Sequence, residues 1–121
     1  MTQRIELPGN GAAAADALKD ASNSRDVVVF KRSPICPVSH RAEAEFTAWV
    51  ETLPEDSSVA IAVIDVIEQR ELARGLTEAL GIQHESPQAL CFRQGELSWH
   101  DSHSALTRAR FLASMEESSH S

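Results

Sequence analysis

Two apolar runs separated by an amphipathic segment constrain the fold of this chain more than any other feature. The runs are "VVVF" at residues 27–30 and "SVAIAVIDV" at residues 58–66, and their β-branched residues are typical of buried strands. Between them, residues 37–53 repeat apolar side chains at steps of three or four residues, as an amphipathic helix does. A strand–helix–strand unit of this kind predicts two parallel strands joined by a right-handed crossover.

Further segments extend this unit on both sides. Strong helix formers, a glycine after a last helical turn and a very short connection between two strands are the signals that identify them. The predicted elements are a helix over 12–21, a helix over 67–81 that ends at Gly81, a hairpin with strands 88–92 and 96–100, and a helix from 105 to about 116 with Ser104 as its N-cap.

This order of elements is typical of an α/β protein. We expect a thioredoxin-like sandwich, with a four-stranded mixed sheet and helices on both faces. The 121 residues suit a single domain, in which residues 1–10 and 117–121 are expected to be flexible.

The charge and the hydropathy pattern exclude several classes of function. A net charge of −7 argues against binding to nucleic acid or to an anionic membrane, since both need basic patches. No apolar run approaches the roughly 20 residues that span a bilayer, and the first residues lack the apolar core of a signal peptide. We therefore expect a cytoplasmic protein, in which the two cysteines are reactive or buried rather than joined.

The first cysteine, Cys36, falls in "SPICPVS", at the junction between the first strand and the amphipathic helix. Pro37 suits the first helical position because its missing N–H would be unpaired there, so Cys36 is predicted to be the N-cap. We expect the N–H groups of Val38 and Ser39 to point toward its sulfur. The positive end of the helix favours a thiolate there.

Two further considerations favour a reactive thiol at Cys36. Cysteines at helix N-termini have pKa values of roughly 3.5–7.5 instead of about 8.5, and the upstream Lys31 and Arg32 are expected to add to this effect. Open α/β sheets also bind ligands beyond the carboxyl ends of their strands, which is where Cys36 is expected. The alternative is a structural cysteine buried in the core.

Ser39 occupies the position at which a C-x-x-C motif carries its second cysteine. A hydroxyl forms hydrogen bonds but cannot resolve a disulfide. Exchange through Cys36 should therefore stop at a mixed disulfide and await an external thiol.

Pro87 begins a predicted strand, at the place where a thioredoxin-like fold has a cis-proline that faces the active thiol and pairs with an extended substrate. We expect the cis isomer, and an ordinary trans proline is the alternative. Cys91 lies four residues further on, roughly 13 Å along the strand, whereas a disulfide needs Cα atoms within about 7 Å. Cys91 is therefore predicted to be a core residue.

The histidines do not predict a metal site. His100 and His103 in "WHDSH", or Cys36 with His40 one helical turn on, form no complete four-ligand set with the spacing of zinc sites. His40 is interpreted as a polar neighbour of the thiol or as a solvated helix residue.

Three motifs, "FKRSPICPVSHRAEAEF", "HESPQ" and "WHDSH", make the chain resemble the monothiol bacilliredoxins, from about residue 12 to residue 115. That family has a thioredoxin-like fold and a C-P-[IV]-S active site. Two positions depart from its pattern: Ser104 stands where a tryptophan is usual, and Cys91 where an apolar residue is usual. Neither departure touches the thiol, although Cys91 leaves a second redox site open.

The resemblance implies removal of bacillithiol, or a similar low-molecular-weight thiol, from mixed disulfides on protein cysteines. Cys36 would be the nucleophile and Ser39 the family's serine. The implied partners are S-thiolated proteins and the thiol co-substrate, with no bound cofactor or metal. The candidate substrate-binding residues are Pro37, Ser86, Pro87, His100 and His103.

Two other functions remain open from the sequence. One is a non-catalytic thioredoxin-like adaptor that holds extended peptides at the Pro87 edge. The other is an iron–sulfur carrier that uses Cys36 with an external thiol, as monothiol glutaredoxins do; Pro37 stands where those proteins have glycine, which disfavours close approach of a cluster.

Overall fold

The computed structural model describes residues 3–119. The elements, in chain order, are β1 (Gln3–Arg4), α1 (Gly11–Ala21), β2 (Val27–Arg32), α2 (Pro37–Glu51), β3 (Ala60–Asp65), α3 (Arg70–Leu80), β4 (Gln88–Arg93), β5 (Glu96–Ser102), the 3₁₀ turn η1 (His103–Ala105) and α4 (Arg108–Ser119). None of the helices in this part of the chain is long and apolar enough to cross a membrane.

The strands form one five-stranded mixed sheet in the order β1-β3-β2-β4-β5. The predicted parallel pair is confirmed, since β2 and β3 run parallel with Val27 opposite Ala60. The predicted hairpin is also confirmed: β4 is antiparallel to both β2 and β5. The closing hairpin therefore supplies the antiparallel edge of the sheet.

The sheet has five strands rather than the four that the sequence predicts. The additional strand is β1, whose two residues pair in parallel with Ala60 and Ile61 of β3. Flexibility was expected for residues 1–10, but in the described part Ile5 and Leu7 pack against the core. Two paired residues are too short for a hydrophobic period to show in the sequence.

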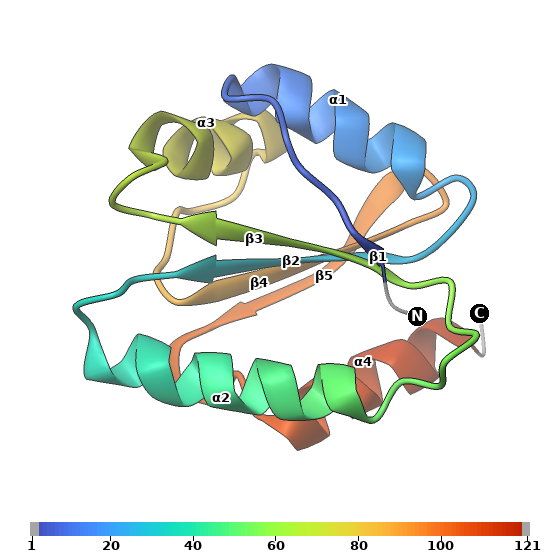
Figure 1. Ribbon diagram of the computed structural model, residues 1–121. Coiled ribbons are helices and arrows are strands. Elements are labelled where there is room, and N and C mark those ends of the chain that lie inside the picture. The colour runs from blue at the N-terminus through green and yellow to red at the C-terminus, as the bar shows by residue number, and fades with distance from the viewer. Residues whose placement is uncertain (1–2, 120–121) are drawn as a thin grey trace.

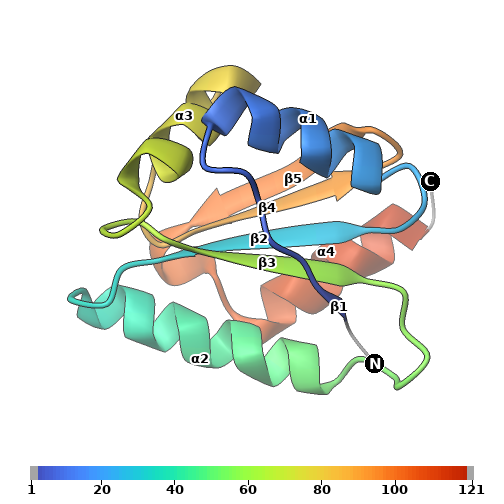
Figure 2. The same ribbon diagram turned by 45° about the horizontal axis from the view of Figure 1, so that its top comes forward.

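The helices cover the two faces of the sheet in pairs, with α1 and α3 on one face and α2 and α4 on the other (Figures 1 and 2). The side chains of β2 alternate accordingly: Val27 and Val29 belong to the core under α1 and α3, and Val28 and Phe30 to the core over α2 and α4. Each face of the sheet thus has its own apolar cluster, as a buried sheet requires.

The core over α2 and α4 is aromatic. Phe46 of α2 stacks on Phe30 with ring centroids 4.9 Å apart, and Trp49 stacks on Phe111 of α4 at 5.4 Å. Such pairs stabilise a core by about 0.5–1.5 kcal/mol each beyond the area they bury. These contacts fix α2 against the sheet and thereby fix the position of the residues at its start.

The opposite core depends on a close approach of two glycines, Gly11 at the start of α1 and Gly75 in α3. A Cβ atom on Gly11 would lie 2.1 Å from the carbonyl carbon of Gly75. Gly81 has a different role: it ends α3 in the left-handed conformation with φ 71°, as the sequence predicts.

Two helix starts differ from the sequence-based expectation. α3 begins at Arg70 rather than at residue 67, because the Asp65 carboxylate accepts hydrogen bonds from the amides of Ile67 and Glu68 and holds these residues in a turn. α4 begins after Thr107, whose hydroxyl accepts from the Arg110 amide at 3.1 Å, so Ser104 is not its cap.

The chain ends are placed away from the start of α2. β1 and the end of α4 lie at the end of the sheet opposite to the β2–α2 connection (Figures 1 and 2). α4 extends to Ser119, so residues 117–119 are helical, although flexibility was expected over 117–121; residues 120 and 121 lie outside the described part.

Candidate active site

Cys36 lies at the N-terminus of α2, as the sequence predicts. Its backbone is extended, with φ −103° and ψ 121°, and Pro37 follows as the first helical residue. The side chain is partly exposed and belongs to neither apolar core. The structural alternative for this cysteine, burial in the interior, is therefore wrong.

The expected hydrogen bonds from the first amides of α2 to the Cys36 sulfur are not formed. Cys36 makes no side-chain capping bond, although its carbonyl accepts from the His40 amide at 3.1 Å. The sulfur still lies at the positive end of a helix of 15 residues, which favours an anion there.

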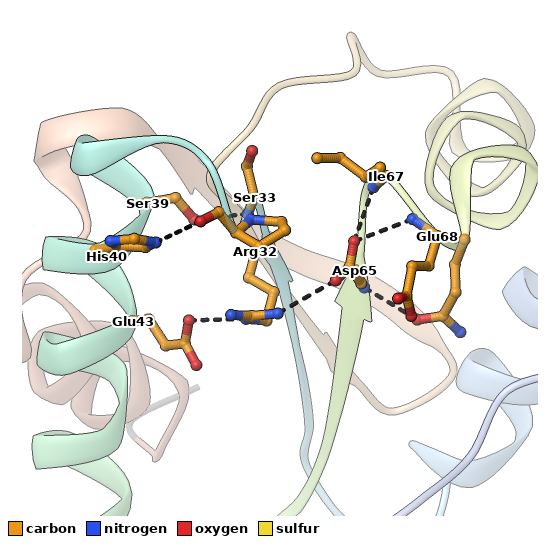
Figure 3. A network of polar contacts seen from close by, with 10 residues as sticks. Arg32, Ser33, Ser39, His40, Glu43, Asp65, Ile67 and Glu68 are labelled. Carbon is orange, nitrogen blue, oxygen red and sulfur yellow. Dashed lines mark hydrogen bonds and ion pairs between the residues drawn. The ribbon is translucent and has the colours of Figure 1, made fainter.

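Ser39 and His40 hold the loop that precedes the thiol (Figure 3). Ser39 is fully buried, and its hydroxyl accepts from the Ser33 amide at 2.7 Å. His40 donates through Nε2 to the Pro34 carbonyl at 2.7 Å, and the Cys36 amide donates to the Ser33 carbonyl at 3.3 Å. In the described structure the partner of the Ser39 hydroxyl is thus the loop backbone rather than the sulfur.

Arg32 connects three elements behind this loop (Figure 3). Its Nε lies 2.8 Å from Glu43 of α2, and one terminal nitrogen lies 3.2 Å from Asp65 at the end of β3. The hydrogen bond with Glu43 is the largest cause that raises the pKa of the guanidinium. Arg32 was expected to assist the thiolate, but its charge is neutralised by these two carboxylates.

Lys31 does not assist the thiolate either. Its side chain is fully buried, and its Nζ lies 2.6 Å from Nδ1 of His84 and 2.8 Å from Oε1 of Gln88. Successive residues of a strand point to opposite faces, so Lys31 lies on the face covered by α1 and α3, away from α2. The sequence placed Lys31 near Cys36 along the chain, but the alternation of the strand separates their side chains.

The Ser86–Pro87 peptide bond is cis, which confirms the expected isomer. Pro87 is buried, and its carbonyl accepts from the His103 amide at 3.0 Å. His103 has a positive φ of 58°, and its Nε2 lies 2.7 Å from Oε2 of Glu85. His103 thus connects the residues around Pro87 to η1.

A cavity of about 230 Å³ joins the start of α2 to η1. It is lined by Pro37, Val38, Arg41, Ala42, Glu45, His103, Ser104, Leu106 and Thr107. Beside it, Ile35 is 80% exposed and Val38 43% exposed, so an apolar rim flanks the thiol. The structure therefore brings Pro37 and His103 to one cavity, and His103 in turn contacts Pro87.

Two of the candidate substrate-binding residues are placed differently. His100 is exposed on β5 opposite Leu90, and its side chain has no hydrogen-bond or ion-pair partner among residues 3–119. The hydroxyl of Ser86 is buried and has no hydrogen-bond partner in the same part of the chain. Their predicted contacts with a substrate stay predictions.

Cys91 is a core thiol, as predicted. It is 1% exposed, lies in the aromatic core with Phe46 and Phe111, and has a raised pKa chiefly because burial disfavours its thiolate. A second redox site at this position would need the core to open. Within the described residues, no group of three or more His, Cys, Asp and Glu side chains could hold a metal ion.

Sequence reasoning missed the polar cluster of Lys31, His84 and Gln88, and it missed Glu85 as the partner of His103. The signal for the cluster was a lysine that directly follows four apolar strand residues. The partner residues lie 53 and 57 positions away, so no spacing rule connects them to Lys31.

Comparisons with known proteins agree with this architecture. The family described as "Monothiol bacilliredoxin BrxC" has a model that matches residues 10–111.

The fold is that of thioredoxin. One solved thioredoxin-fold protein is 21% identical with a TM-score of 0.70, over 94% of this chain and 93% of that chain. Desulfothioredoxin from Desulfovibrio vulgaris Hildenborough is 22% identical (TM-score 0.64; 97% and 99% covered), and Fasciola hepatica thioredoxin is 14% identical (TM-score 0.66; 93% and 98% covered).

Proposed function

Because the chain belongs to the monothiol bacilliredoxin family, we propose that it is a monothiol thiol–disulfide oxidoreductase that acts through Cys36. Its substrates are protein cysteines that carry bacillithiol or a similar low-molecular-weight thiol. Family membership and the thioredoxin fold support a redox role of this general kind. The identity of the substrate and the roles of the individual site residues are our proposal.

The proposed reaction consists of two thiol–disulfide exchanges. The Cys36 thiolate attacks the bacillithiol sulfur of the mixed disulfide, a bond forms between these two sulfurs, and the target protein leaves as a thiolate. A second low-molecular-weight thiolate then attacks the same bacillithiol sulfur, which releases Cys36 as a thiolate and produces the low-molecular-weight disulfide. The second thiol supplies the electrons that reduce the target, and no further cofactor enters the balance.

The observation that carries this proposal is the environment of Cys36. The thiol is partly exposed at the start of α2, while the chain's other cysteine is 1% exposed in the core. Thiol exchange requires an accessible sulfur with thiolate character. The partial exposure of Cys36 gives the access, and the positive end of α2 favours a negative charge there. Since Ser39 replaces a resolving cysteine and is itself buried, the mixed disulfide on Cys36 must be resolved from outside.

The surroundings of the thiol suit a protein-bound disulfide. Ile35 and Val38 form an apolar rim, and Pro37, Pro87 and His103 lie on or next to the adjoining cavity. We propose that these three residues contact the thiolated protein. Ser39 is proposed to support the reaction by holding the loop before Cys36 through Ser33.

The test compares release of bacillithiol from a bacillithiolated protein by wild type, Cys36→Ala and Cys91→Ala, with free bacillithiol as the second thiol. Cys91→Ala is the matched control because it removes the chain's other thiol. We expect wild type and Cys91→Ala to release the thiol at similar rates and Cys36→Ala to fall to the uncatalysed rate. Equal release by wild type and Cys36→Ala would contradict the proposal and favour the peptide-binding adaptor.

A further inference from the structure

A buried lysine lies beneath the segment that carries Pro87. Lys31 is fully buried on β2, on the face where Val27 and Val29 pack into the core under α1 and α3. Removal of a cation from water is costly, and burial is the main reason why the pKa of Lys31 is lowered to about 7. An apolar side chain would continue the pattern of β2 without this cost. Packing alone therefore does not account for a lysine here.

The lysine forms a cluster with His84 and Gln88, which we call the lysine cluster. Its Nζ lies 2.6 Å from Nδ1 of His84 and 2.8 Å from Oε1 of Gln88. Gln88 is 1% exposed; its Oε1 also accepts from the Glu85 amide at 3.3 Å, and its Nε2 donates to the Gln83 carbonyl at 3.0 Å. The lysine cluster thus holds three residues of the segment 83–87, namely Gln83, His84 and Glu85.

The same segment is connected to the cavity beside the thiol. Gln88 follows Pro87 directly, and Lys31 is its partner in the β2–β4 register. Glu85 pairs with the His103 ring at 2.7 Å, and the His103 amide donates to the Pro87 carbonyl at 3.0 Å. Contacts therefore run without interruption from the buried Nζ of Lys31 to the wall of the cavity next to Cys36.

We propose that Lys31 is a positioning residue for the disulfide substrate: through His84 and Gln88 it fixes segment 83–87, so that the backbone around Pro87 is in place to receive the peptide that carries the mixed disulfide. The inference rests on the proposed function, because it assigns Lys31 a part in binding that function's substrate. Lys31 touches none of the reacting sulfurs, so its effect should appear in peptide binding rather than in sulfur exchange.

The test uses two disulfides with the same Cys36 thiol. One is a bacillithiolated peptide, which needs the Pro87 backbone, and the other is 5,5′-dithiobis(2-nitrobenzoate), which has no peptide. In Lys31→Met, a buried amine is replaced by an apolar chain of similar length. We expect kcat/KM for the peptide to fall about tenfold, mainly through a higher KM, because the hydrogen bonds from Lys31 to His84 and Gln88 are lost. The rate with the small disulfide should change less than about twofold.

Two additional variants make the test decisive. Lys19→Met, on α1, alters the chain's other lysine and should behave as wild type with both disulfides. His84→Leu removes one partner of Lys31 at a half-buried loop position, and it should weaken peptide turnover in the same way, even if Lys31→Met does not fold.

Each remaining outcome overturns the inference. An equal loss with both disulfides would mean that the lysine cluster only supports the fold, and failure of both variants to fold would mean the same. Unchanged kinetics with both disulfides, in the presence of wild-type turnover of the peptide, would overturn the inference alone. A wild type that leaves the bacillithiolated peptide intact would overturn the proposed function and this inference with it.

Discussion

At the scale of single residues, Ser39 determines how the thiol is presented. Its hydroxyl is fully buried and provides the acceptor for the Ser33 amide, at the point where the chain leaves β2. A thiol at this position would be a weaker acceptor for that amide. A serine at position 39 therefore has two effects. It leaves Cys36 without a second cysteine in the motif, and its hydrogen bond with Ser33 holds the loop before Cys36.

The role of Ser39 can be tested with Ser39→Ala, which leaves the Ser33 amide buried without its partner. We expect the free energy of unfolding to fall by about 1–3 kcal/mol, and turnover to fall with it because the loop loosens. Denaturant unfolding and the bacillithiol-release assay measure the two effects. Ser24→Ala, at an exposed position, should stay within about 0.5 kcal/mol of wild type. Lost turnover with unchanged stability would instead indicate that the hydroxyl acts directly at the sulfur.

The charge of Lys31 should make stability depend on pH. The pKa of Lys31 is lowered from 10.5 to about 7, chiefly by burial and in addition by the Arg74 cation, while Glu85 opposes the shift. Between these two values the unfolded chain binds more protons at this site than the folded chain does. The contribution of Lys31 to the free energy of unfolding therefore rises with pH from about 7 to about 10.5. Below about pH 7 the amine is charged in both states, and the destabilisation caused by its burial has its full value.

Comparison with Lys31→Met isolates this effect, since other groups that titrate in the window are common to both proteins. We expect wild type to gain stability relative to Lys31→Met as the pH rises from 7 toward 10. Urea unfolding at several pH values measures the difference, with Lys19→Met as a control that should parallel wild type. Parallel profiles for wild type and Lys31→Met would show that Lys31 titrates near its ordinary pKa.

At the scale of elements, the packing of α1 on α3 depends on the absence of a side chain at one position. Gly11 is buried at the first residue of α1, where the backbone of Gly75 leaves no space for a Cβ atom. The three nearest contacts of that atom would all be with backbone, which cannot rotate away as a flexible side chain can. The distance between these two helices is therefore set by the two glycines.

Gly11→Ala should destabilise the protein by about 1–3 kcal/mol, because a Cβ atom 2.1 Å from the Gly75 carbonyl carbon forces the helices apart. Thermal or urea unfolding measures the loss. Gly9→Ala is the matched control, since nothing lies within 4 Å of its Cβ position, and we expect it to change stability by less than about 0.5 kcal/mol. Equal stability of the two variants would show that α1 moves freely relative to α3.

At the scale of the whole molecule, local patterns predicted most of the fold but not its long-range contacts. The apolar run of β2, the period of α2 and the short hairpin connection are local signals, and the elements they predict form. β1 was missed because two residues carry no period, and the start of α3 because the Asp65 side chain competes with helix formation. Neither the pairing of β1 with β3 nor the hydrogen bonds of the Asp65 side chain produces a periodic pattern in the sequence.

The same distinction holds for the site. Proline and helix periodicity placed Cys36 correctly at the N-cap, because that position depends on neighbouring residues. The prediction that Lys31 and Arg32 assist the Cys36 thiolate was wrong. Their partners come from α2, β3 and the segment before β4, which the local sequence does not reveal. Charges near a thiol in sequence act on it only if the fold leaves them unpaired, and here other groups bind both.

The location of the chain ends has a practical consequence. β1 and the end of α4 lie at the end of the sheet opposite to the β2–α2 connection (Figure 1). A solid support, fluorophore or fused domain attached at either end would therefore leave the sulfur turned toward the solution. In the proposed reaction, an immobilised form of the protein would retain the low-molecular-weight thiol on Cys36 and return the target protein to the solution.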